Sequence, residues 1–175
     1  MTDWPEIMAK HGGIVWKTVC RLVGDDADSR DCFQESFVAA LEFSRKHTVR
    51  NWPGLLKRLA TVRALDCLRK RLGIAAMPLI DRGIAEPSSP VRSPSSFAEE
   101  KELFDELRAA LSVMPPDQAE ACCLRYLENM SYQQISDQLD VTVNYVGVLL
   151  HRAKSALQVQ LAAFAPVACD KQENK

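Results

Sequence analysis

Apolar residues recur at intervals of three and four positions through most of this chain, which is the period of an amphipathic helix. The segment 28–44 is one example, because Phe33, Phe37 and Leu41 fall on one helical face. No stretch shows the sustained alternation of apolar and polar residues that a half-buried β-strand requires. We therefore predict an all-α protein with helices at 5–22, 28–44, 52–71, 96–114, 117–128, 131–139 and 143–161.

The composition changes between 73 and 96, where four prolines and five serines gather. Proline removes helical hydrogen bonds, so this density predicts a flexible linker between two small helical domains. The predicted organisation is an N-terminal domain at 1–72, a linker at 73–97, a C-terminal domain at 98–165 and a tail at 166–175.

The segment 131–161 has the pattern of two short helices joined by a tight turn. Ser131, followed three residues later by Gln134, is a capping-box pattern at the start of the first helix. Apolar residues four apart then continue on both sides of the turn at 140–142. This pattern is typical of a helix-turn-helix, although any helical hairpin produces a similar one.

The formal net charge is only −1 at pH 7, but the charges are unevenly distributed. Residues 43–71 hold nine Lys and Arg residues and a single acid, Asp66. Such a concentrated cationic stretch suits a polyanion, whatever the total charge of the chain. A solvated helix face is the simpler alternative for a basic run of this kind.

The remaining composition excludes several classes of protein. Hydrophobic residues make up 47% and charged residues 26%, which is ordinary for a globular protein. No run approaches the roughly 18–20 uncharged apolar residues of a membrane helix, and no secretory signal is visible, so we expect a cytoplasmic protein. The six cysteines lack CxxC spacing, so we expect reduced thiols, no metal site and no cofactor. A thiol enzyme using Cys122 or Cys123 is an alternative, although buried small hydrophobes account better for this vicinal pair.

Two blocks of sequence, in order, resemble a known family. The first is DCFQESF at 31–37, followed by WPGLLKRLATVRALDCLRKR at 52–71. The second runs from LSVMP at 111–115 through LENMSYQQI at 127–135 to HRAK at 151–154. Together they resemble the small two-domain bacterial sigma factors of the extracytoplasmic-function class, in the sigma-70 family.

The resemblance implies a transcription initiation factor that binds core RNA polymerase, and not an enzyme. In that family the N-terminal domain docks on the coiled coil of the largest polymerase subunit and opens the minus-ten promoter element. The C-terminal helix-turn-helix reads the minus-thirty-five element, and the linker runs toward the active-site channel. An anti-sigma factor is the usual control, so the expected partners are core polymerase, promoter DNA and an anti-sigma factor, without membrane insertion.

The family pattern also implies three sets of site residues. The polymerase-docking set is Asp31, Gln34, Glu35 and Phe37. The DNA-binding set at the minus-ten element is Arg50, Asn51, Trp52, Lys57, Arg58, Arg63, Arg69 and Lys70. The DNA-binding set of the helix-turn-helix is Ser131, Thr142, Asn144, Tyr145, Val148, Leu149, Arg152 and Lys154.

The roles of two residues in the basic stretch can be argued from physical chemistry. Trp52 could stack with an unpaired base or, alternatively, pack on the core at the start of its helix. Asp66 shares the apolar stripe of the same helix, so its carboxylate needs a partner, for which Arg69 and Lys70 are candidates.

The last helix departs from the family pattern. Asp140 stands where the turn usually has glycine, and the run 147–149 is Gly-Val-Leu where Lys-Ser-Arg is usual. The loss of two cations weakens contacts to phosphate and guanine, and 117–165 holds three basic residues against five acids. We therefore expect weak DNA binding by this domain alone.

The alternative function is that of a helix-turn-helix DNA-binding regulator, or of a sigma-like adaptor, that acts without polymerase-dependent promoter melting. Such a regulator has no need of the acidic cluster Asp31, Gln34 and Glu35, whose spacing places it on one helix face. This cluster favours the polymerase subunit.

Overall fold

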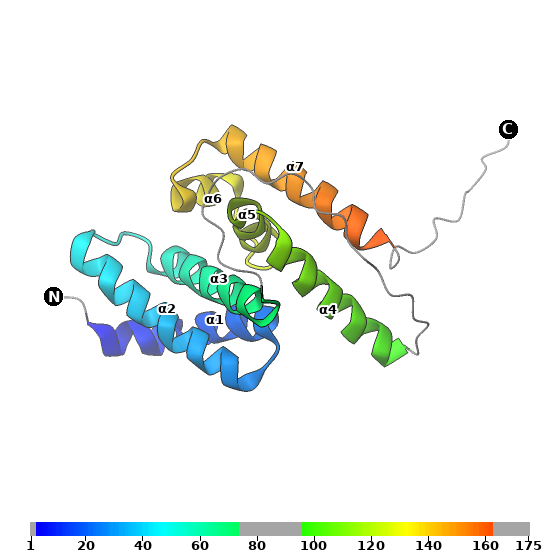
Figure 1. Cartoon of the computed structure of the whole chain (residues 1–175). Coiled ribbons are helices and arrows are strands. Elements are labelled where there is room, and N and C mark those ends of the chain that lie inside the picture. The colour runs from blue at the N-terminus through cyan, green and yellow to red at the C-terminus, as the bar shows by residue number, and fades with distance from the viewer. Residues whose placement is uncertain (1–2, 74–95, 163–175) are drawn as a thin grey trace, which may run out of the picture.

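Seven α-helices, and no strand, make up the part of the chain that the computed structural model describes, residues 3–73 and 96–162 (Figure 1). The all-α expectation is confirmed, and the helix bounds differ from the predicted ones by at most two residues. The predicted tail, and nearly all of the predicted linker, lie outside the described residues. The helices are α1 Trp4–Val23, α2 Asp26–Lys46, α3 Trp52–Arg71, α4 Ser96–Val113, α5 Pro116–Tyr126, α6 Tyr132–Leu139 and α7 Val143–Gln160.

Side-chain caps define where the N-terminal helices begin. Asp3 accepts a hydrogen bond from the backbone N–H of Glu6 at 3.1 Å, and Asp25 caps α2 in the same way. The carboxamide oxygen of Asn51 accepts from the N–H of Gly54 at 3.0 Å, so the predicted cap of α3 is confirmed. Because a cap satisfies N–H groups that no helical carbonyl can reach, these helix starts are set by local sequence.

The helix-turn-helix is formed by α6 and α7. Ser131 and Gln134 form the predicted capping box, with bonds of 3.2 and 2.8 Å between each side chain and the backbone of the other. Asp140 ends α6 with φ 54°, so it supplies the left-handed residue for which glycine is usual. Thr142 then caps α7.

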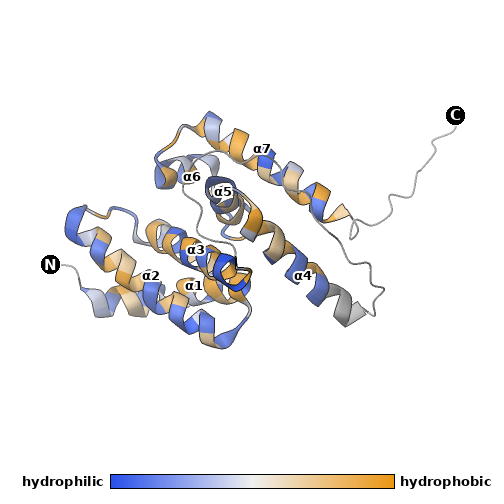
Figure 2. Cartoon of the chain, in the orientation of Figure 1, coloured by the Kyte–Doolittle hydropathy of each residue, from blue (hydrophilic) through white to orange (hydrophobic). Residues whose placement is uncertain are grey.

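Helix α3 is the centre of the molecule, since it packs against α1, α2, α4, α5 and α6. Figure 2 shows hydrophobic and hydrophilic residues alternating around the helices, as expected for amphipathic elements. One core cluster joins α1–α3 to α4, α5 and α7, with Val15 and Leu65 on one side and Leu111 and Cys123 on the other. The two halves of the chain therefore share a core in this arrangement.

A smaller apolar cluster holds the helix-turn-helix together. It combines Leu124 of α5 with Ile135 of α6 and with Val146 and Leu150 of α7, all of which are buried. Among the described helices, none combines the length and the apolar character needed to cross a bilayer.

Candidate functional site

The acidic cluster expected to dock a polymerase lies on the outer face of α2. Asp31, Gln34 and Glu35 are all exposed, one helical turn apart, so their side chains are available to a partner. The expectation for Phe37 as a contact residue needs correction, because its side chain is 7% exposed and packs against Phe33 with ring centroids 5.1 Å apart. Phe37 supports this face from the core and does not lie on it.

Some basic residues in and next to α3 are exposed to solvent, whereas others form ion pairs with acidic residues of the chain. Arg50 precedes the helix and Lys70 lies near its end, and both are exposed. Lys57 and Arg58 instead face the C-terminal half. The ammonium group of Lys57 lies 3.3 Å from the carboxylate of Glu128, and Nε of Arg58 lies 2.7 Å from that of Glu120. Arg58 also donates to the backbone carbonyl of Gln138.

Two further arginines of α3 surround Asp66. Arg69 pairs with the Asp66 carboxylate at 3.3 Å, and Arg63 approaches it at 4.0 Å. The predicted need of Asp66 for a basic partner is thus met by Arg69. The Arg69 side chain is only 11% exposed, so its guanidinium is far less accessible than that of a surface cation.

Trp52 packs at the start of α3 against Trp4 of α1. The two rings meet edge to face, with centroids 5.4 Å apart, and Trp52 is half-buried against the common core. This geometry favours the core-packing alternative for Trp52 over an exposed base-stacking platform. Asn51 is exposed, but its side-chain oxygen is engaged as the helix cap.

The N-terminal part of α7 presents most of the residues expected to contact DNA. Those that are exposed are Asn144, Tyr145, Val148, Arg152 and Lys154, together with the two caps Ser131 and Thr142. Leu149 is an exception that corrects the sequence-based expectation, because it is 2% exposed and packs in the apolar cluster of the helix-turn-helix. A buried side chain of this kind cannot reach a base edge.

Comparisons with known proteins match this arrangement. Residues 104–157, which span most of α4 and all of α5 and α6 and nearly all of α7, match the family "Sigma-70, region 4". The chain is 30% identical, over 165 residues, to the ECF RNA polymerase sigma factor SigE of Mycolicibacterium smegmatis, covering 93% of this chain and 63% of that protein. The chain is thus similar, over most of its length, to a sigma factor of the extracytoplasmic-function class, and it spans a little under two thirds of the length of that relative.

Two further proteins are similar to this chain. The chain is 22% identical, over 161 residues, to the ECF RNA polymerase sigma factor SigW of Bacillus subtilis, covering 84% of this chain and 82% of that protein. The sigma factor RpoE, solved in complex with the anti-sigma factor NepR from Bartonella quintana, has a TM-score of 0.53 at 17% identity, covering 93% of this chain and 98% of that one. The latter likeness concerns the fold alone.

Helix α7, together with Tyr132 of α6, borders an apolar groove of about 510 Å³. Gly147 is one of its lining residues, and a Cβ added there would lie 4.0 Å from the ring of Tyr132. The guanidinium of Arg125 lies 5.4 Å from the centroid of the Tyr132 ring and steadies this wall. Apolar contact with thymine methyl groups therefore suits this face better than an array of cationic contacts does. The groove is lined by Tyr132, Val143, Asn144, Gly147, Val148, His151 and Arg152.

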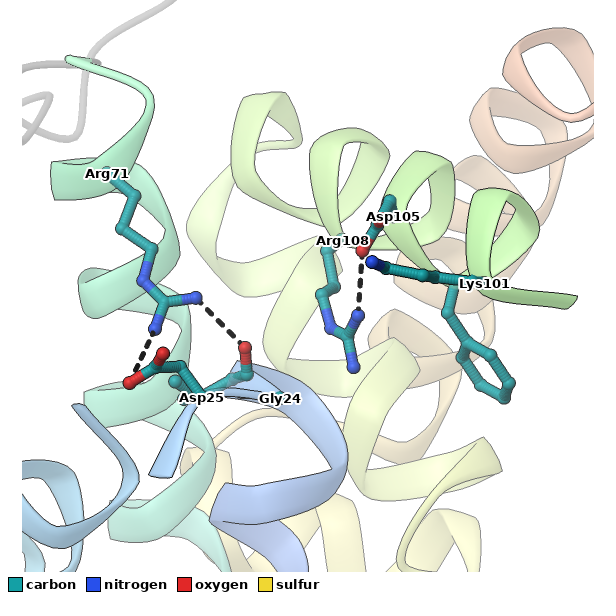
Figure 3. A pocket seen from close by; sticks show the side chains of 8 residues that line it. Gly24, Asp25, Arg71, Lys101, Asp105 and Arg108 are labelled. Carbon is teal, nitrogen blue, oxygen red and sulfur yellow. Dashed lines mark hydrogen bonds and ion pairs between the residues drawn. The ribbon is translucent and has the colours of Figure 1, made fainter. Parts of the chain in front are cut away.

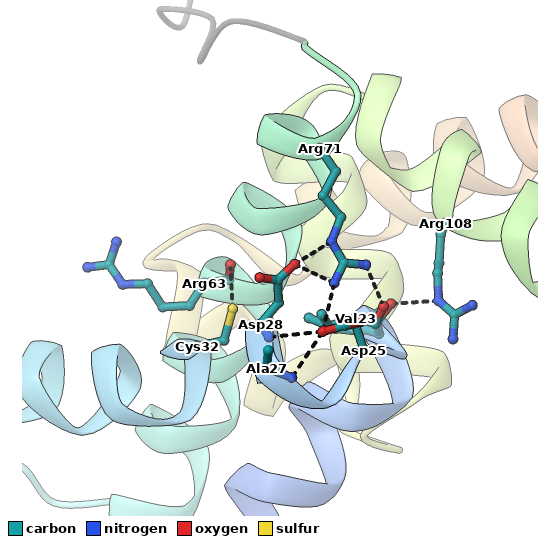
Figure 4. Close-up of polar contacts among 9 residues, drawn as sticks. Val23, Asp25, Ala27, Asp28, Cys32, Arg63, Arg71 and Arg108 are labelled. Carbon is teal, nitrogen blue, oxygen red and sulfur yellow. Dashed lines mark hydrogen bonds and ion pairs between the residues drawn. The ribbon is translucent and has the colours of Figure 1, made fainter. Parts of the chain in front are cut away.

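A second cleft, of about 480 Å³, lies where the end of α1 meets α3 and α4 (Figure 3). Its two arginines bond to backbone carbonyls at the end of α1: Arg71 to Val23 at 3.0 Å and Arg108 to Leu22 at 2.8 Å. Arg71 also pairs with Asp28 of α2 at 2.5 Å (Figure 4). Cations at a helix C-terminus are stabilised by its dipole, so both arginines have structural roles here.

Three cysteines of the described part of the chain, Cys32, Cys122 and Cys123, are buried and contribute to packing. Burial raises the pKa of Cys122 to about 11 and that of Cys32 to about 12, and it raises the pKa of Cys123 well above its usual value. A thiol with a raised pKa is a poor nucleophile at neutral pH, because the thiolate is the reactive form. This chemistry disfavours the thiol-enzyme alternative.

Sequence reasoning missed the acids that meet α3. Glu120 and Glu128 were counted only as part of a net-acidic domain, yet both are largely buried against cations of the N-terminal half. The signal was present, because Glu120 lies between Ala119 and Ala121 in an apolar stretch, where an acid needs a partner. The identity of that partner could not be read from the local sequence.

Proposed function

We propose that this chain is a sigma factor that binds core RNA polymerase and directs it to specific promoters. The observation that carries the proposal is the presence, in one chain, of an exposed acidic face on α2, a cationic α3 and a capped helix-turn-helix. An exposed acidic cluster suits a basic surface of a protein partner, whereas the cations of α3 suit the phosphates of a DNA strand. No catalytic step is assigned to the chain.

The roles of the two halves follow the same proposal. The N-terminal domain, 1–72, docks on the largest polymerase subunits through Asp31, Gln34 and Glu35 and engages the minus-ten element through α3. The C-terminal domain, 98–165, places α7 at the minus-thirty-five element, with Asn144, Tyr145 and Arg152 as hydrogen-bonding side chains. The segment 73–97 links them, and an anti-sigma factor is the expected controlling partner.

Run-off transcription tests the proposal directly. Purified core polymerase is combined with promoter fragments from the source genome, with and without this protein. We expect specific transcripts only when the protein is present. Sequence-selective binding to duplex DNA by the protein alone, without any transcript from added polymerase, would instead support a helix-turn-helix regulator.

A further inference from the structure

Two cysteines face each other where α2 packs against α3. The Asp28 carboxylate, near the start of α2, pairs with Arg71 at the end of α3 at 2.5 Å (Figure 4). One turn further along α2, Sγ of Cys32 donates to the backbone carbonyl of Arg63, which lies two turns back on α3, at 3.6 Å. The two helices therefore run antiparallel, and one turn from the ion pair this register places Cys32 opposite Cys67.

The two thiols contact each other directly. The side chains of Cys32 and Cys67 are hydrogen-bonded to each other, and the Cys67 thiol also contacts the Asp28 carboxylate. Both cysteines are free thiols. Cys32 is 4% exposed, whereas Cys67 is half-buried. A small oxidant can thus reach Cys67 from solvent, and Cys32 can reach Cys67 without opening the core.

The side chains around the pair let the two helices approach closely. Ser29 and Ser36 of α2, one turn before and one turn after Cys32, are buried, and so is Ala64 of α3, three residues before Cys67. The distance between packed helices depends on the size of the side chains at the contact, so small ones favour a short distance. A disulfide needs this proximity, because its two sulfur atoms lie only about 2 Å apart.

We propose that Cys32 and Cys67 form a redox-active pair, which hydrogen peroxide converts into a disulfide that ties α2 to α3 and stabilises the N-terminal half. In the first step the Cys67 thiolate attacks one peroxide oxygen, the O–O bond breaks and a sulfenic acid forms. The Cys32 sulfur then attacks the Cys67 sulfur, so that the S–S bond forms and the S–O bond breaks. The thiols lose two electrons, the peroxide gains them, and both thiol protons leave in the two water molecules that are produced. The proposal does not depend on the proposed function.

The surroundings of the thiols set the order and the speed of these steps. Burial raises the pKa of Cys67, and the Asp28 carboxylate raises it further, whereas the hydrogen bond from Cys32 and the Arg71 cation oppose this shift. Because the thiolate is the reactive form, oxidation is slow at neutral pH and faster in mild alkali. A negative charge on Cys67 is also one cause of the raised pKa of Cys32. The neutral sulfenic acid lacks that charge, so oxidation of Cys67 makes Cys32 a better nucleophile for the second step.

The disulfide would join the two helices that carry the proposed binding surfaces. It closes a ring that spans residues 32–67, and it lies one residue from Asp31 on the docking face of α2. A crosslink across a ring of this length restricts the unfolded chain more than the folded one. We therefore expect the midpoint of thermal unfolding to rise by about 5–15 °C on oxidation and to return to its initial value when dithiothreitol reduces the bond.

Peptide mapping of the full chain tests the proposal. The reduced protein is incubated with hydrogen peroxide at pH 8.5, remaining thiols are blocked with N-ethylmaleimide, and the protein is digested with trypsin without reduction. Cleavage after lysine and arginine places Cys32 in the peptide 31–45 and Cys67 in the peptide 64–69. We expect mass spectrometry to detect these two peptides joined by a disulfide, and to detect them separately after dithiothreitol.

The test variant is Cys67→Ser, and the matched control is Cys20→Ser, which removes another half-buried thiol, on α1. Oxidation should raise the unfolding midpoint of wild type and of the control but not that of the test variant. Circular dichroism of the reduced proteins verifies that each one folds. Cys67→Ala takes the place of Cys67→Ser if the serine variant does not fold.

Three results would overturn the proposal. One is oxidation of Cys67 to a sulfinic acid while Cys32 stays reactive toward N-ethylmaleimide, because the two sulfurs would then not combine. Another is a disulfide that joins either peptide mainly to a different cysteine. The third is a joined pair of peptides without a rise in the unfolding midpoint, because the bond would then not stabilise the packing of α2 on α3.

Discussion

The Nε atom of Arg58 on α3 lies 2.7 Å from the carboxylate of Glu120 on α5, across the boundary between the two halves of the chain. Glu120 is largely buried, with Arg58 and Arg69 as its cationic neighbours and Asp117 as an anionic one. Burial raises the pKa of the Glu120 carboxyl above its usual value, despite the opposing effect of Arg58. The ion pair thus only partly offsets the desolvation of the carboxylate.

This balance predicts a pH dependence with a definite sign. An acid whose pKa is higher in the folded than in the unfolded chain binds its proton more tightly when folded, so acidification favours the folded state. As pH falls from 7 toward the unfolded pKa of Glu120, wild type should gain unfolding free energy relative to Glu120→Gln. Urea denaturation of both proteins across this range measures the difference. The control variant is Glu106→Gln, at an exposed site. Wild type should gain no unfolding free energy relative to this control over the same pH range, and an equal gain would contradict the assignment to Glu120.

The docking face on α2 yields a second prediction. Reversing the charges of Asp31 and Glu35 to Lys should weaken binding to core polymerase while leaving helicity unchanged, because both side chains are exposed. Removing one partner of a charge pair in an interface costs about 2–5 kcal/mol, so we expect at least about tenfold weaker binding. Co-purification with core polymerase checks this. Glu102→Lys with Glu106→Lys carries the same charge change on α4 and should retain binding, whereas wild-type yield for the α2 variant would remove this face from the site.

A third prediction separates two neighbours on the recognition helix. Leu149→Ala removes a buried side chain and should lower the unfolding free energy by about 2–5 kcal/mol. Val148→Ala, at a position that is 41% exposed, should change it by no more than about 0.5 kcal/mol. Urea midpoints followed by circular dichroism give both values. Equal effects at the two positions would mean that the rotation of α7 about its axis differs from that described.

The turn of the helix-turn-helix gives a fourth prediction, in which one substitution has opposite effects at two nearby sites. Asp140→Gly should raise the unfolding free energy by up to about 1 kcal/mol, because the left-handed conformation with φ 54° disfavours residues that have a Cβ. Asp137→Gly, inside α6, should lower it by about 1 kcal/mol, because glycine weakens a helix interior. Thermal or urea unfolding measures both. A loss of stability at 140 would show that the Asp side chain contributes more there than its backbone strain removes.

Much of the fold could be predicted from the sequence, because its signals act over a few residues. Asn51, Ser131 and Thr142 satisfy backbone groups within three residues of themselves, and Asp140 adopts its turn conformation locally. Apolar spacing of three and four positions places helices without knowledge of their neighbours. The acidic cluster Asp31, Gln34 and Glu35 is exposed for the same reason, because the buried residues of α2, such as Cys32, Ser36 and Ala40, fall on a different face of the helix.

The candidate site on α7 was predicted less well, for a reason that its own sequence contains. Leu149 lies three residues after Val146 and four before Ala153, which places it on the buried face, as the structure confirms. Alignment with the family pattern favoured contact with DNA, whereas the helical period indicated the core. Packing against α5 and α6 decides which face of α7 is buried, and a motif alone does not state that orientation.

Only the tertiary structure decides which acidic residues pair with the cations of α3. Lys57 and Glu128 are separated by 71 residues in the chain, and Arg58 and Glu120 by 62. Sequence composition identifies a cationic helix and a net-acidic domain, and opposite charges attract, but attraction does not specify which pairs meet. That choice follows from the apolar cluster of α3 and α5, which aligns the two helices and brings each carboxylate to one particular cation. The sequence determined that α3 would be a basic helix, and the packing of the two domains determined that Lys57 and Arg58 would be paired within the chain.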